Sequence, residues 1–405
     1  MITGKTKNTW LVWSAAFAYG LIGIEIVIMI SPFALYFYSV YGPILEFFSA
    51  HPALSWLTEF FLPHMVFLDD PLVLGISYLQ ILLVVGMALF FFAAIPLYYG
   101  RFTGKGVVRF SFYSKIRHPQ YLFLAISGFG LLLYWPRFII LILYITMLFV
   151  YYLLARNEEW RMLLEAPGGY ADYMKSTPMF FPGEPGDKIY QALFAWIRPK
   201  WLSVLVVYLL SMALAMVIAM AIRQYAVNQL PIVVRQNLVL LPVFPASVEK
   251  VTSIYQALEA SPQVRAVMAD QKPNLAYIFP GDYFLTAIVT DQDRRFSDDM
   301  IKRFPEVLEW HQNKFRGGLG EFFKIFYNFF KTLGTIETDY EIERIVLIRV
   351  GDELGEPVAG GTVFAMGLKR TPVMIVDLDA EDHHVVSVIK VSGGHKWGSM
   401  PMPTF

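Results

Sequence analysis

The chain has 405 residues, 33 basic and 33 acidic side chains, a mean hydropathy of +0.49 and 56% apolar residues. This apolar excess is typical of a membrane protein, and the balanced charge gives no support for nucleic-acid binding. The sequence contains no cysteine, which excludes disulfides, thiolate catalysis and cysteine-ligated metal sites.

Five apolar segments are predicted to cross a membrane as helices, because a span needs about 20 apolar residues. They cover residues 10–38, 71–99, 121–134, 138–154 and 201–222. The first lacks a small-residue cleavage site and is read as a retained span. The third is short, so we expect it to be tilted or sheltered by its neighbours. Residues 44–69 are apolar but contain charged and histidine side chains, which predicts an interfacial or re-entrant helix.

The charges of the loops predict an orientation. Loop 100–120 contains five Lys or Arg residues and no acid, whereas loop 43–70 contains four acids and no Lys or Arg. By the positive-inside rule, loop 100–120, the N-terminus and residues 155–200 are cytoplasmic. We therefore expect a multi-pass protein, with a bacterial inner membrane as its location and the region after residue 222 outside.

A second domain is predicted from about residue 226, where charged residues increase and the apolar period changes. Residues 1–225 form the membrane bundle and residues 226–405 an extramembrane α+β domain that ends in an antiparallel set of strands. Strands are expected at 232–234, 238–243, 283–290, 343–350, 362–366, 373–376 and 384–391, with helices at 246–260, 296–315 and 320–333. The last helix is rich in phenylalanine, so it is either core or an interface.

One polar segment raises the question of a metal site. It contains Asp377, Asp379, Glu381, Asp382, His383 and His384. A polar turn between two strands explains these residues more simply than metal binding does, and no metal is predicted.

The most informative stretch is 111–182. It contains, in order, Tyr113, the run Arg117-His118-Pro119 with Tyr121 two positions further, an apolar hairpin, Arg156, the pair Glu158-Glu159, Tyr170, Tyr173 and Pro182. Charged groups near lipid are costly unless they are paired or bind something polar. Because a hairpin returns the chain to its starting side, we expect His118 and Glu158 to meet at one membrane face.

Residues 100–185 resemble the isoprenylcysteine carboxyl methyltransferase and phospholipid N-methyltransferase superfamily, whose members are integral membrane enzymes that use S-adenosylmethionine. The resemblance implies cofactor contacts from Arg117, His118, Pro119, Tyr121, Glu158 and Glu159. Tyr113, Tyr170 and Tyr173 are further candidates, since tyrosine offers a ring and a hydroxyl. Phe123 is a departure, because many members have a small residue at this position.

Each motif residue also has a structural explanation. Instead of binding a cofactor, Arg117 could anchor the chain at the membrane surface, and Glu158 and Glu159 could form a solvated helix end. Arg156 and Glu158 are the candidate catalytic residues, with Arg156 placed to meet an acceptor carboxylate or phosphate, but Arg156 could equally extend to the membrane interface. Tyr170 and Tyr173 could close over the cofactor or serve as interfacial anchors.

Two functions are therefore expected. The first is methyl transfer from S-adenosylmethionine to a membrane lipid or lipidated substrate, through a carboxylate or amine. The second is a non-catalytic, methyltransferase-like subunit that scaffolds a membrane protein complex through its C-terminal domain.

Overall fold

The computed structural model describes residues 42–103, 108–165, 167–181, 183–280, 342–352 and 354–390, with a few residues between 20 and 36. The chain forms two compact units. The first contains Met1–Ile44, Phe60–Leu62 and Pro71–Gln224, and the second Leu45–Glu59, Pro63–Asp70 and Tyr225–Phe405. The predicted strand 283–290 and helices 296–315 and 320–333 lie outside the described residues, as does nearly all of the predicted span 10–38.

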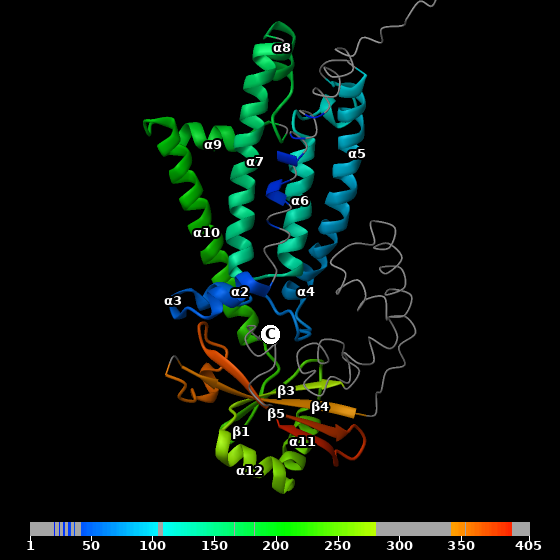
Figure 1. Ribbon diagram of the computed structural model, residues 1–405, viewed down its shortest axis with the longest axis vertical. Coiled ribbons are helices and arrows are strands. Elements are labelled where there is room, and N and C mark those ends of the chain that lie inside the picture. Colours follow the sequence, from blue (N-terminus) through cyan, green and yellow to red (C-terminus); the bar gives the residue numbers. More distant parts are fainter. Residues whose placement is uncertain are drawn as a thin grey trace, which may run out of the picture. The chain divides into compact units, whose positions relative to one another are not determined.

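The first unit is helical (Figure 1). Its helices are α4 (Pro71–Tyr78), α5 (Leu82–Phe102), α6 (Pro119–Tyr134), α7 (Phe138–Glu165), α8 (Pro167–Ser176), α9 (Pro185–Leu193) and α10 (Lys200–Asn228), and short 3-10 helices η2 (Leu79–Ile81) and η3 (Ser111–Ser114) precede α5 and α6. Three helical stretches are long and apolar enough to cross a membrane, namely Pro71–Gly100, Phe138–Glu165 and Lys200–Asn228. The described residues thus support part of the predicted set of five spans.

Helix α6 has only 16 residues, and most of its side chains are buried. It lies between α5 and α7 (Figure 1). Glycines permit the close approach of α5 and α6, because a Cβ at Gly130 would collide with the backbone of Leu83, and one at Gly86 with the backbone of Ser127. Small residues at helix interfaces are a common means of packing in membranes.

The segment between residues 44 and 69 is not the single interfacial or re-entrant helix that its apolar composition predicts. Short helices α2 (Gly42–Ser49) and α3 (Pro52–Ser55) and the 3-10 helix η1 (Trp56–Thr58) are followed by chain without helix. Within the second unit, Glu59 forms a buried ion pair with Arg370 at 2.7 Å. Such a carboxylate needs a charged partner away from water, and the partner is supplied by a strand far along the chain.

The second unit contains a six-stranded sheet in the order β1-β2-β3-β4-β5-β6. The strands are β1 (Val233–Arg235), β2 (Leu238–Pro242), β3 (Leu275–Pro280), β4 (Ile342–Gly351), β5 (Lys369–Asp379) and β6 (Val385–Lys390). β2 and β3 are parallel, and the other neighbouring pairs are antiparallel. The sheet is therefore mixed, with the expected antiparallel set at its C-terminal end.

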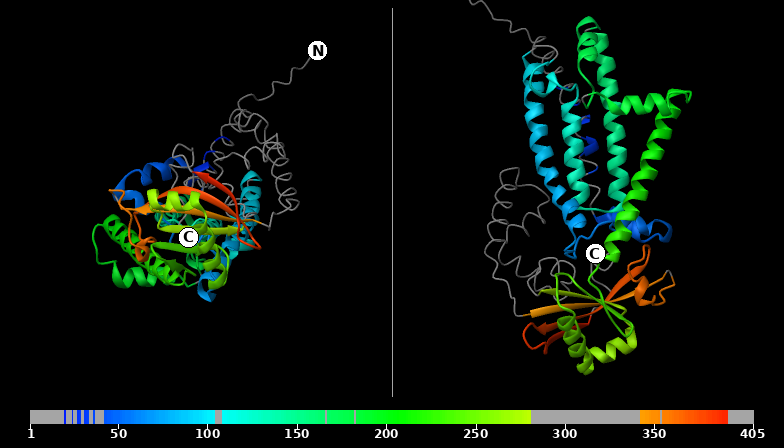
Figure 2. Two further views of the ribbon diagram at one scale, coloured as in Figure 1. Left: turned by 90° about the horizontal axis from the view of Figure 1, so that it is seen from below. Right: turned by 180° about the vertical axis from the view of Figure 1, so that it is seen from behind.

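Helices α11 (Val248–Ala260) and α12 (Pro262–Gln271) connect the two parallel strands. Serines begin both helices, since Ser247 accepts the amide of Lys250 and Ser261 that of Val264. Both helices lie on one face of the sheet (Figures 1 and 2). Their buried residues, among them Ile254, Leu258 and Val264, pack against Leu240, Ile345 and neighbouring strand residues to form the core.

Two strand predictions differ from the structure. β3 was not expected, although all but the last of its residues are buried. Residues 362–366, predicted as a strand, instead follow the 3-10 helix η4 (Gly360–Thr362) as turns, because Ala365 and Thr362 donate their amides to carbonyls three residues back.

Replacement of Gly130 by alanine tests the contact between α5 and α6. The added methyl group must separate two backbones, so we expect a loss of about 1–3 kcal/mol in stability. Gly75→Ala is the matched control, because nothing lies within 4 Å of a Cβ at that position. Thermal unfolding in detergent should show a lower midpoint for Gly130→Ala only, and equal midpoints for the two variants would contradict the described packing.

Candidate functional site

The two halves of the sequence motif meet at one end of the α6–α7 hairpin. His118 is the N-cap residue of α6, and Pro119 occupies the first turn, where its missing N–H costs nothing. α7 extends beyond the predicted span to Glu165, so Glu158 and Glu159 lie within its last two turns. The turn at Pro136 lies at the opposite end of the hairpin. The structure therefore brings the two motifs together, as the return of the chain requires.

Arg117 is the most connected side chain of this cluster. Its Nε donates to Oε1 of Glu159 at 2.7 Å, and both side chains are buried. Its Nη1 donates to the carbonyls of Met174 and Thr177, and its Nη2 lies 3.8 Å from Glu184. The guanidinium thus links the start of α6 to the end of α7 and to the chain after α8. A surface anchor would not be buried in this way.

His118 lies between the two glutamates. Its Nδ1 is 3.3 Å from Oε2 of Glu158 and its Nε2 is 3.5 Å from Oε1 of Glu159. The ring is buried, and neither nitrogen reaches hydrogen-bond geometry. Burial lowers the pKa of His118, but the two carboxylates more than offset burial, so this pKa lies above the usual value of 6.5.

Glu158 and Arg156 form the more open edge of the cluster. The Tyr121 hydroxyl donates to Oε1 of Glu158 at 2.9 Å, and the Tyr121 ring packs against that of Tyr151. Arg156 lies 3.7 Å from Oε2 of Glu159, yet 60% of its side chain is exposed. Its remaining N–H groups are therefore accessible to a ligand.

The three candidate tyrosines pack around the cluster. Tyr113 donates to Oε1 of Gln120 at 3.1 Å, and Tyr173 donates to the carbonyl of Tyr113 at 2.6 Å. Tyr170 and Tyr173 are buried with their rings 5.8 Å apart, which is unlike exposed interfacial anchors. Burial raises the pKa of Tyr173 to about 12, so this hydroxyl remains a proton donor at neutral pH.

Sequence reasoning missed Glu184 and Gln120. Glu184 has a positive φ of 43° and accepts the amide of Met179 at 2.6 Å, which places its carboxylate beside Arg117. No motif spacing marks this residue. Gln120 lies inside the motif itself and could have been identified as the partner of a buried tyrosine. Phe123 is also buried, and its ring packs edge-on against Phe112 at 4.9 Å.

The polar segment 377–384 does not gather around one point. Asp377 pairs with Arg344 at 2.7 Å, and His383 lies 3.5 Å from Glu343. Asp379, Asp382 and His384 remain close together in the turn between β5 and β6, where His384 contacts Asp382 at 2.6 Å. These three residues lie where the sequence predicts a polar turn, and their potential ligand atoms are all within 4.8 Å of one another.

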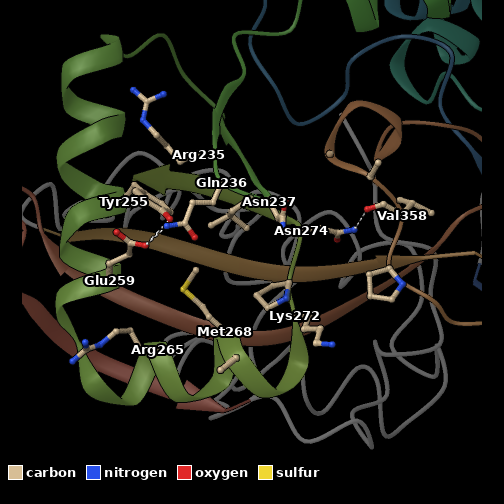
Figure 3. A pocket seen from close by; sticks show the side chains of 16 residues that line it. Arg235, Gln236, Asn237, Tyr255, Glu259, Arg265, Met268, Lys272, Asn274 and Val358 are labelled. Carbon is tan, nitrogen blue, oxygen red and sulfur yellow. Dashed lines mark hydrogen bonds between the residues drawn. The ribbon is translucent and has the colours of Figure 1, made fainter.

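A cavity of about 650 Å³ lies in the sheet domain, between the β1–β2 turn, α11, α12 and residues 357–360. Two of its polar side chains already have partners, since Gln236 donates to Glu259 and Asn274 donates to the backbone carbonyl of Val358 (Figure 3). Arg235 and Arg265 point in different directions (Figure 3). Because the charged groups do not converge, this cavity indicates no particular ligand.

Comparisons with protein-family models, with curated proteins and with solved structures find no match to this chain.

Titration of His118 should appear in the stability of the protein. Because its pKa is raised in the folded state, its stabilising contact with the glutamates is complete below pH 6.5 and is lost as the pH rises through the raised value. His118→Gln cannot titrate. We therefore expect the difference in unfolding temperature between wild type and this variant to shrink as the pH increases, and parallel pH curves would refute the ion pairing.

Proposed function

We propose that this chain is an integral-membrane methyltransferase that uses S-adenosylmethionine and acts on a lipid-borne or membrane-embedded carboxylate or amine. The main support is the cluster at the end of the α6–α7 hairpin, where His118 lies between Glu158 and Glu159 with both ring nitrogens lacking hydrogen bonds. Buried titratable groups that are ion-paired but whose hydrogen-bonding capacity is not filled often mark functional sites.

The residues present are chemically suited to this cofactor. Oε2 of Glu159 is also buried without a hydrogen bond, so the cluster has both acceptor and donor capacity unused. Carboxylates suit ribose hydroxyls and an amino group, whereas His118 and Arg117 suit a carboxylate. Tyr113, Tyr121, Tyr170 and Tyr173 provide aromatic walls, and Pro119 fixes the start of α6.

The bound cofactor would supply an activated methyl group, and no nucleophilic side chain is then required. The chain has to orient the acceptor and exclude water. Arg156 is placed for the first task, because its exposed donors can hold an acceptor carboxylate or phosphate while Glu159 fixes its position. Glu158 is partly exposed, so it can contact both cofactor and acceptor.

A second candidate is the non-catalytic subunit that acts as a scaffold. One observation favours it, since Arg117 already contacts Glu159, Glu184 and two backbone carbonyls. A guanidinium with these contacts stabilises the bundle whether or not a cofactor binds. In this alternative, the extramembrane domain would contact the partner complex.

Calorimetric titration with S-adenosylmethionine distinguishes the methyltransferase from the scaffold subunit. We expect wild type to bind, and Glu158→Ala and His118→Ala to bind about ten- to a hundredfold more weakly, because each leaves polar groups of the cofactor unpaired at about 1–3 kcal/mol. Asp172→Ala is the control, since this exposed carboxylate of α8 pairs only with exposed Lys175 among its described contacts. No binding by wild type at millimolar cofactor would favour the scaffold.

We also propose that loop 100–120 and residues 155–200 lie on the cytoplasmic side and the sheet domain on the opposite side. The positive loop charge supports this orientation. The compact units support it as well. Pro63–Asp70 precedes the membrane-capable stretch Pro71–Gly100, and Tyr225–Phe405 begins at the end of the stretch Lys200–Asn228. Both segments belong to one unit, so these two helix ends are expected on the same side of the membrane.

Single cysteines introduced into this cysteine-free chain test the orientation. Leu354 is 88% exposed in the sheet domain, and Lys175 is exposed in α8. In spheroplasts, an impermeant thiol reagent should modify Leu354→Cys directly and Lys175→Cys only after permeabilisation. The reverse pattern would invert the proposed topology.

A further inference from the structure

Helix α9 presents an apolar face that no side chain in the described part of the bundle covers. Ile189 and Leu193 are one helical turn apart and are each 57% exposed, and Trp196, just beyond the helix, is 77% exposed. Asp187 and Gln191 lie on the other face, where they are in contact at 3.5 Å. The helix is therefore amphipathic, with its apolar side turned outward.

The remaining side of α9 is attached to the start of α10. Ser203 donates to the hydroxyl of Tyr190 at 2.8 Å and lies 3.0 Å from the carbonyl oxygen of Phe194. Figures 1 and 2 show α9 crossing the end of α10 instead of continuing along it. If α10 spans a bilayer, α9 must therefore lie along the membrane surface.

Three observations identify what covers the apolar face. In the membrane-capable part of α10 only 6% of residues are buried within the described part of the chain, so its apolar side chains suit a lipid environment. Trp201, in the first turn of α10, is also exposed, and tryptophan favours the boundary between headgroups and acyl chains. Lys188 in α9 and Arg198 and Lys200 in the chain that follows it are also exposed, and cations suit the phosphates of lipid headgroups.

We propose that α9 is an interfacial membrane helix. Ile189, Leu193 and Trp196 insert at the boundary between headgroups and acyl chains, and Lys188, Arg198 and Lys200 contact anionic phospholipid headgroups. Amphipathic helices that lie in the plane of the interface bury an apolar face in this way. The inference does not depend on methyl transfer, but it places a lipid-bound helix in the same unit as the Arg117–Glu159 cluster.

Fluorescent labels on single cysteines test the depth of the helix in the full-length protein, reconstituted in vesicles. Leu193→Cys and Ile189→Cys should be quenched strongly by brominated lipids and several-fold less by aqueous iodide than the control Gln191→Cys on the opposite face. Iodide quenching at Leu193 equal to that at Gln191 would overturn the proposal. Protection of Leu193 from both quenchers would also overturn it, since protein would then cover the face.

The headgroup contact has its own test. Labelled Leu193→Cys with the three cations intact should differ between vesicles of phosphatidylcholine alone and vesicles containing phosphatidylglycerol, with the label more protected in the anionic lipid from acrylamide, an uncharged aqueous quencher. The triple variant Lys188→Gln/Arg198→Gln/Lys200→Gln should lose this difference while its label stays accessible to brominated lipid. A lipid difference that persists unchanged in the triple variant would refute the role of the three cations.

Discussion

The helical unit depends on the ion pair between Arg117 and Glu159. Two charges removed from water are stable only when they are paired and their remaining donors find acceptors, and here the other N–H groups of Arg117 reach the carbonyls of Met174 and Thr177. This one guanidinium therefore fixes three segments against one another. The position of His118 and the direction of the chain after α8 follow from it.

The meeting of the two motifs was predictable from the sequence, because an even number of spanning helices separates them. Two apolar helices of a hairpin return the chain to one face, and this brings His118 to Glu158 over 40 positions. The acceptors of Arg117 were not predictable, since backbone carbonyls have no signature in side-chain identity. Glu184 was missed for a related reason, because its position depends on a left-handed backbone conformation and on the amide of Met179.

The same holds for the fold: the elements that local sequence patterns mark were predicted, and those that depend on distant residues were missed. β4, β5 and the helix after Ser247 are marked by local patterns of β-branched residues and capping. β3 is buried along nearly its whole length, so it lacks the alternation that reveals a half-buried strand. Residues 362–366 have strand-forming composition, yet the amides of Thr362 and Ala365 close turns, and Gly367 follows with a positive φ of 80°. The segment 44–69 was misread because the partner of Glu59 is Arg370, which no local pattern reveals.

The contact between Glu59 and Arg370 also affects the order in which the chain can fold during its synthesis. The two residues are 311 positions apart, so at about 5–20 residues per second a ribosome adds Arg370 roughly 15–60 s after Glu59. During that interval the ion pair between Glu59 and Arg370 cannot form. The segment before α4 therefore gains this contact only after β5 has been synthesised, and a nascent chain that ends before β5 should expose this segment to proteases more than the full-length chain does.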